Sequence, residues 1–82
     1  MNITIYSTTT CGYCHALSTW LDKQSIAYTR KNTDEGQAAL VEFMSVNDGN
    51  IGVPFTVIDN DGQQTKIIGF DQPKFKQILG IQ

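Results

Sequence analysis

Two cysteines, Cys11 and Cys14, stand where a strand-like segment gives way to a helix-like one. The start of a helix presents backbone N–H groups without a helical partner and a partial positive charge, and both favour a thiolate over a thiol. We therefore predict that the pKa of the Cys11 thiol lies below that of a free cysteine. Cys14 follows nearly one turn later on the same side, so it can reach the sulfur of Cys11 once a mixed disulfide has formed there. The spacing predicts an attacking thiol at Cys11 and a resolving thiol at Cys14.

The same residues fit two other chemistries less well. A structural zinc site needs four ligands, whereas the chain has two cysteines and one histidine, His15. The string from Cys11 to His15 also matches the attachment motif of c-type haem, but haem would require export, a second axial ligand and a helical fold. We therefore expect no metal site. Neighbouring residues of a helix do not face each other, so we interpret His15 as a partly exposed helix residue and not as a general base for Cys14.

A second motif, Val53-Pro54, allows two interpretations. A proline that opens a strand is usually a feature of an edge strand. Downstream of a cysteine pair, it can instead be a cis-proline beside the cysteines, with the backbone of Val53 turned outward to pair with an extended thiol peptide. Cis is the minority state of an X-Pro bond, so the residues alone leave both interpretations open.

A third motif, Gly69-Phe70-Asp71, precedes the last predicted helix. Its structural interpretation is a turn followed by an N-cap, since Asp is a favoured residue at that position. Its functional interpretation is an anion site, because the free N–H groups of a helix start can hold the carboxylate of a ligand. Both interpretations remain open at this point.

Strand-like and helix-like segments alternate around these motifs. Runs rich in β-branched residues predict strands, and apolar residues at helical spacing predict helices. Asp34 is expected to cap the second helix, with Gln37 completing a capping box; Asp71 or Gln72 is expected to cap the third. The predicted elements are strands 2–6, 26–31, 53–59 and 64–68, a hairpin turn at 60–62, and helices 12–24, 34–46 and one that starts near residue 73.

The order βαβαββα predicts an α/β fold. The first βαβ unit implies two parallel strands joined by a right-handed crossover, and the later hairpin adds two antiparallel strands. The expected architecture is a four-stranded mixed sheet flanked by three helices, with helices on both faces. A chain of 82 residues, 40% hydrophobic and 17% charged, is expected to form one domain over residues 1–82.

Charge and hydropathy argue against several classes of partner. The net charge of -2 argues against nucleic acid, which needs a basic surface. No apolar run approaches the roughly 20 residues that span a membrane, so no membrane association is expected. The segment from Met1 to Thr4 lacks a basic stretch followed by a long apolar one. We expect a cytoplasmic protein, in which a close cysteine pair is more often catalytic or metal-binding than structural.

Three motifs in order make the chain resemble the glutaredoxin family over almost its whole length: Tyr6 to Cys14, Gly52-Val53-Pro54 and Gly69-Phe70-Asp71. The resemblance implies a thioredoxin fold and the reduction of disulfides or of glutathione mixed disulfides. It also implies that Cys11 is the nucleophile and Cys14 the resolving thiol.

The resemblance further implies a binding site for glutathione. Tyr13 would line the thiol groove, and Val53 would pair with the cysteinyl part of glutathione ahead of a cis Pro54. Phe70 and Asp71 would hold its γ-glutamyl end.

The sequence departs from many glutaredoxins at positions that bear on glutathione. Gly12 stands where many have proline, and Thr8 stands where many have a lysine that binds a glutathione carboxylate. The predicted helix 34–46 carries no basic residue for that carboxylate. Tyr13 and residues 45–50 are similar to the mycoredoxin branch, whereas Gly69-Phe70 is similar to glutaredoxin-like redoxins that reduce ribonucleotide reductase.

These observations predict a thiol–disulfide oxidoreductase that uses Cys11-Gly12-Tyr13-Cys14 to reduce protein disulfides and mixed disulfides of glutathione or similar small thiols. Glutathione is the expected co-substrate and no tightly bound cofactor is expected. Expected partners are disulfide-containing client proteins and a thioredoxin-type reductase, and the protein is expected to be a monomer. Two alternatives stay open. One is a carrier that holds a [2Fe-2S] cluster between two subunits, which the absence of the motif proline allows, and the other is a dedicated electron donor to a client such as ribonucleotide reductase.

Overall fold

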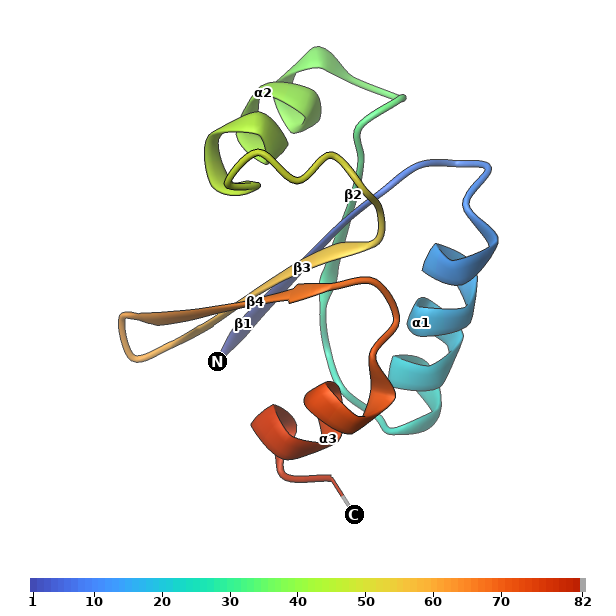
Figure 1. The fold of residues 1–82 in the computed structure, drawn as a ribbon. Coiled ribbons are helices and arrows are strands. Elements are labelled where there is room, and N and C mark those ends of the chain that lie inside the picture. The colour runs from blue at the N-terminus through green and yellow to red at the C-terminus, as the bar shows by residue number, and fades with distance from the viewer. Residues whose placement is uncertain (82) are drawn as a thin grey trace.

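The computed structural model describes residues 1–81 and has the predicted order of elements (Figure 1). The sequence pattern placed every element within a few residues of its observed position. The elements are β1 (Asn2–Ser7), α1 (Gly12–Lys23), β2 (Thr29–Asn32), α2 (Gln37–Val46), β3 (Phe55–Asn60), β4 (Gln63–Ile68) and α3 (Gln72–Leu79).

The four strands form one mixed sheet in the order β2-β1-β3-β4. β1 pairs with β2 in parallel, as the βαβ unit predicts, and β3 pairs with both β1 and β4 in antiparallel orientation. In the register between β1 and β3, Tyr6 lies opposite Phe55. This four-stranded mixed sheet with three helices is the thioredoxin fold, so the predicted fold class is confirmed.

Helices cover both faces of the sheet, with α1 and α3 on one side and α2 on the other (Figure 1). Side chains of a strand alternate between the two faces, so Ile3 and Ile5 of β1 join the core under α1 and α3, whereas Tyr6 joins the core under α2. The larger cluster consists of Ile3, Ile5, Leu17, Leu21, Ile58, Ile67 and Phe75, and the smaller one of Tyr6, Phe43, Phe55 and Val57. No helix within residues 1–81 has the length and apolarity to cross a membrane.

The second strand starts at Thr29, three residues later than predicted, because α1 ends in a closed motif. Ser25 adopts the left-handed conformation (φ 57°) and its N–H donates to the Asp22 carbonyl at 3.0 Å. The N–H of Ile26 donates to the Leu21 carbonyl at 3.1 Å. This is the Schellman arrangement, in which the two flanking apolar residues also pack together. Ile26 therefore packs against the core as part of the helix end and does not extend a strand.

The predicted capping box at the second helix is wrong. α2 begins at Gln37 and its cap residue is Gly36, which has no side chain to accept a hydrogen bond. The Asp34 carboxylate accepts hydrogen bonds from Thr9 instead, in the segment before Cys11.

The cap of α3 is as predicted, because Asp71 accepts a hydrogen bond from the Lys74 N–H at 3.3 Å. β3 begins at Phe55, two residues after the predicted start.

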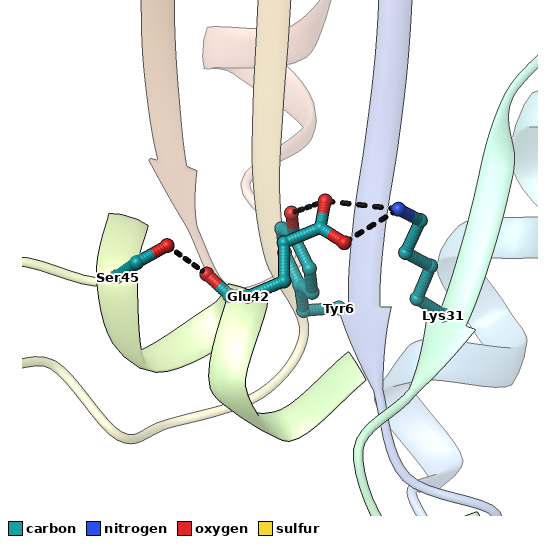
Figure 2. Close-up of polar contacts among 4 residues, drawn as sticks. All are labelled: Tyr6, Lys31, Glu42 and Ser45. Carbon is teal, nitrogen blue, oxygen red and sulfur yellow. Dashed lines mark hydrogen bonds and ion pairs between the residues drawn. The ribbon is translucent and has the colours of Figure 1, made fainter. Parts of the chain in front are cut away.

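A polar network joins α2 to the sheet beside the smaller core (Figure 2). The Tyr6 hydroxyl donates to Glu42 Oε1 at 2.7 Å, and Lys31 Nζ lies 2.9 Å and 2.7 Å from the two carboxylate oxygens. Burial and the hydrogen bond to Glu42 raise the pKa of Tyr6. The hydrogen bonds from Lys31 and then Tyr6 hold the pKa of Glu42 below its ordinary value of 4.5. Glu42 therefore stays ionised at neutral pH and pairs with Lys31.

Glu42→Gln is expected to lower the free energy of unfolding at pH 7 by about 0.5–1 kcal/mol, because the ion pair is half-exposed and solvent screens it. A carboxyl whose pKa is lower in the folded state stabilises the fold above its unfolded-state pKa, and this stability is lost as the pH falls through the folded-state pKa. The difference in free energy of unfolding between the wild type and Glu42→Gln should therefore shrink from pH 6 to pH 3. Urea unfolding across that range measures it, with Glu35→Gln as a charge-matched control. A difference in free energy of unfolding that stays constant with pH would contradict a stabilising role for the ionised Glu42 carboxylate.

Candidate active site

Cys11 occupies the N-cap position of α1 and holds its sulfur over the start of the helix. Its backbone is extended (φ −83°, ψ 111°), and its Sγ accepts a hydrogen bond from the Cys14 N–H at 3.2 Å. The two cysteines form a disulfide, with their Cα atoms 5.2 Å apart. The helix start thus supplies the backbone donor that a thiolate at Cys11 needs.

The two sulfurs differ in access to solvent. Cys14 is fully buried on the face of α1 that packs against the sheet, whereas Cys11 is partly exposed. Gly12 and Tyr13 lie between them on the exposed face, and the Tyr13 side chain is 73% exposed. A disulfide approaching from solution therefore reaches Cys11 first.

The Val53-Pro54 segment lies directly beside Cys11. The peptide bond between Val53 and Pro54 is cis, which confirms the cis form of this bond. The Val53 carbonyl oxygen lies 3.9 Å from Cys11 Sγ, although 42 positions separate the two residues in the sequence. Pro54 is buried, and its carbonyl accepts a hydrogen bond from the Gly69 N–H at 2.8 Å.

The Gly69-Phe70-Asp71 segment is connected to this site through the bond between Gly69 and Pro54. Phe70 is partly buried, and its ring packs against Trp20 with centroids 5.9 Å apart. Asp71 is exposed and its carboxylate caps α3. The structure thus gives Phe70 and Asp71 local structural roles and brings their segment next to the cis-proline.

The segment that carries the cysteine pair has no acidic or strongly basic side chain of its own. No Asp, Glu, Lys or Arg occurs between Ser7 and Leu21. His15 is exposed on α1, as predicted. Within residues 1–81 no cluster of three or more His, Cys, Asp or Glu side chains could hold a metal ion. The donor that the structure shows for a thiolate at Cys11 is the backbone N–H of Cys14 in the first turn of α1.

Residues of β2 support the segment before Cys11, and the sequence pattern did not reveal them. Arg30 Nε donates to Ser7 Oγ at 2.8 Å, and Arg30 Nη2 donates to the Thr8 carbonyl at 3.3 Å. Ser7 Oγ in turn donates to Asn32 Oδ1 at 2.5 Å. The sequence offered no signal for them, because only the structure shows that Ser7 is buried and that its hydroxyl needs a partner.

Comparison with known proteins assigns the chain to a family. The glutaredoxin family profile matches residues 3–63, which include both cysteines and the cis-proline. The chain belongs to the glutaredoxin family. Members of this family are thiol–disulfide oxidoreductases, and this glutaredoxin is one of them, with a Cys11–Cys14 pair that forms a disulfide.

Relatives and solved structures agree with this assignment. This glutaredoxin is 40% identical to Rv3198A of Mycobacterium tuberculosis, which carries the name glutaredoxin, over 93% of this chain and 89% of that protein. It is 44% identical to mycoredoxin 1 of Corynebacterium glutamicum over 74% and 73% of the two chains. The glutaredoxin-like protein NrdH-redoxin of Escherichia coli has the same fold, with a TM-score of 0.75 and 23% identity over 95% of both chains.

In the reduced protein, iodoacetamide at pH 7 is expected to alkylate Cys11 about tenfold or more faster than Cys14. Only the thiolate reacts, its fraction changes tenfold per pKa unit, and Cys14 is buried. Peptide mapping by mass spectrometry after short labelling times measures both rates. The Cys11→Ser variant serves as the control and should label slowly. Preferential labelling of Cys14 would reverse the two roles.

Proposed function

We propose that this glutaredoxin reduces protein disulfides and mixed disulfides of glutathione or a similar small thiol, with Cys11 as nucleophile and Cys14 as resolving thiol. The observation that carries the proposal is the difference between the two sulfurs. Cys11 is partly exposed and its Sγ accepts a hydrogen bond from a backbone N–H at the helix start, whereas Cys14 is fully buried. One sulfur is therefore suited to meet a substrate and the other to act only within the protein.

The reaction follows from thiol–disulfide exchange. The Cys11 thiolate attacks one sulfur of the substrate disulfide, forms a mixed disulfide with it and expels the other sulfur as a thiolate, which takes a proton from solvent. Cys14, after losing its proton, then attacks Cys11 Sγ and expels the second substrate thiolate. The substrate gains two electrons and the protein is left with the Cys11–Cys14 disulfide. Two molecules of a small thiol, or a thioredoxin-type reductase, return the pair to the dithiol.

Substrate binding is proposed on both sides of Cys11. Tyr13, highly exposed in the first turn of α1, would line the groove for the thiol. The backbone of Val53 would pair with the cysteinyl part of the substrate, which its position 3.9 Å from Cys11 Sγ supports. Phe70 and Asp71 would hold the γ-glutamyl end of glutathione, which the contact between Gly69 and Pro54 supports.

A second candidate function is that of an electron donor dedicated to a protein client such as ribonucleotide reductase. The observation that favours it is the segment that carries the cysteines, which has no Asp, Glu, Lys or Arg from Ser7 to Leu21 and leaves Tyr13 73% exposed. Lys31 and Lys66 are engaged by Glu42 and Asp48, so neither is a free cation for a glutathione carboxylate. The E. coli relative with this fold is described as having a thioredoxin-like activity profile.

Cys14→Ser separates these two functions. A glutathionyl group on Cys11 can be released by a second glutathione from solution, so a deglutathionylating enzyme should retain most of its turnover in the variant. A mixed disulfide with a protein client needs Cys14, whose effective concentration at Cys11 far exceeds that of free thiols, so turnover with a client should fall about a hundredfold or more. Assays with a glutathionylated peptide and with a protein disulfide measure the two activities.

Cys11→Ser is the control for that experiment and should abolish both activities. A covalent complex between the Cys14→Ser variant and a protein substrate, visible on a non-reducing gel, would support the dedicated donor if the wild-type protein also shows little activity on the glutathionylated peptide. Turnover that persists in Cys11→Ser with either substrate would overturn both mechanisms.

A further inference from the structure

The segment that leads from β1 to Cys11 runs outside the sheet and is held by residues in β2 and directly after it. Thr9 and Thr10 are exposed. The Thr33 N–H donates to the Ser7 carbonyl at 2.8 Å, where β1 ends. Arg30 Nη2 donates to the Thr8 carbonyl at 3.3 Å. The position of Cys11 thus depends on contacts with a part of the chain more than twenty residues away.

Asp34 makes the most extensive of these contacts. Its carboxylate oxygens accept hydrogen bonds from the Thr9 N–H at 3.0 Å and 3.1 Å and from Thr9 Oγ1 at 2.6 Å. The hydrogen bonds from the Thr9 hydroxyl and backbone lower the pKa of Asp34. Hydrogen bonds to an ionised carboxylate are stronger than those between neutral groups. Asp34 has no role as a helix cap, since α2 begins three residues later with Gly36 as its cap.

Thr9 lies within the turn that ends at Cys11. The Cys11 N–H donates to the Thr8 carbonyl at 3.4 Å, which closes a turn with Thr9 and Thr10 at its centre. Fixing Thr9 therefore fixes the direction in which the chain enters α1. Cys11 Sγ needs that direction to remain 3.2 Å from the Cys14 N–H and 3.9 Å from the Val53 carbonyl oxygen.

We propose that Asp34 is a positioning residue for the redox reaction, because it binds Thr9 and thereby holds the Thr8–Cys11 turn so that the Cys11 sulfur stays over the start of α1. This inference rests on the proposed role of Cys11 as the nucleophile. It assigns to Asp34 no contact with the substrate. Its effect is on the pKa of the Cys11 thiol and on the approach of Cys14.

The direction in which the pKa of the Cys11 thiol shifts when Asp34 is replaced distinguishes a positioning role from a purely electrostatic one. A carboxylate near Cys11 disfavours a thiolate, so removing its charge alone would lower the pKa of the Cys11 thiol. Loss of positioning moves the sulfur away from the helix N–H groups and raises that pKa. The two explanations therefore predict opposite shifts for the same substitution.

The test compares reduced wild-type protein with Asp34→Ala and Asp34→Asn. The rate of Cys11 alkylation by iodoacetamide, measured from pH 4 to pH 9, gives the thiol pKa. Asp34→Ala is expected to raise it by about half a unit, which is about threefold less thiolate at pH values below both pKa values. Asp34→Asn keeps one acceptor oxygen for Thr9, so its Cys11 thiol pKa should lie between those of the wild type and Asp34→Ala. Because Asp34 is exposed, the thermal midpoint should stay close to that of the wild type.

A second measurement follows Cys14. With 5,5′-dithiobis(2-nitrobenzoate), attack by Cys11 releases one thionitrobenzoate and leaves the other bound to Cys11, and attack by Cys14 then releases the second. The second release is expected to slow about tenfold in Asp34→Ala, because small misplacement of reacting atoms has large effects on rate. Thr9→Val, which removes the hydroxyl donor, should show part of this loss, and Thr9→Ser should restore wild-type behaviour.

Glu35→Gln is the matched control, since it removes a neighbouring charge but keeps an acceptor oxygen for Asn32 and makes no contact with Thr9. An unchanged or lowered Cys11 pKa together with an unchanged second release in Asp34→Ala would overturn the positioning role. A lowered thermal midpoint with unchanged thiol chemistry would also overturn it, in favour of a purely structural contact. Slow alkylation of Cys11 in the wild type itself would instead overturn the proposed function and this inference with it.

Discussion

The antiparallel pairing of β1 with β3 is the constraint on which the site depends. Because Tyr6 lies opposite Phe55, the chain leaves β1 next to the point where it enters β3. The turn before α1 and the Val53-Pro54 segment therefore meet at one edge of the sheet, which brings Cys11 Sγ within 3.9 Å of the Val53 carbonyl oxygen. A register slip of one residue would turn Tyr6 to the opposite face and separate the two segments. Burial of Tyr6 and Phe55 in the smaller core makes such a slip costly.

The two cores are unequal, and the reactive helix is carried on the larger one. Leu17 and Leu21 fix the middle and end of α1 against Ile5, Ile58 and Phe75, and Cys14 is buried in its first turn. α2 is held by one apolar cluster around Phe43, together with the network around Glu42. A site built on rigidly packed elements keeps its geometry better than one built on loops. The N–H group that contacts the Cys11 sulfur therefore belongs to a helix packed on the larger core.

The donor at the Cys11 sulfur is a backbone N–H at the start of α1, and the nearby charged side chains bind the preceding segment. Charged side chains are absent from residues 7–21, and the cations and anions near this segment bind its backbone. Arg30 and Asp34 thus have opposite charges but similar tasks, one holding the Thr8 carbonyl and the other the Thr9 N–H. Preorganised backbone donors need no rearrangement when a thiolate forms or leaves. This arrangement suits a sulfur that alternates between thiolate and disulfide, two forms with different charge.

Short stretches of the sequence determine many of the structural elements of this glutaredoxin. The cysteine pair, the order βαβαββα, the apolar faces of the helices and the Asp71 cap all depend on neighbours within a few residues, and each was predicted. Local chemistry also misled at two places, because Ile26 has the character of a strand residue and Asp34 that of a helix cap. Ile26 instead closes the Schellman motif at the end of α1, and Asp34 instead accepts hydrogen bonds from Thr9, 25 positions away.

Only the tertiary structure determines the contacts between segments that lie far apart in the chain. The choice of the cis form at Val53-Pro54, its place beside Cys11, and the attachment of Arg30 and Asp34 to the segment before Cys11 are all of this kind. Local patterns determine which element a residue joins, because the conformational preferences of the backbone act over one turn or one pair of strand residues. Strand register and helix placement determine which distant groups meet, and these depend on the packing of both cores at once.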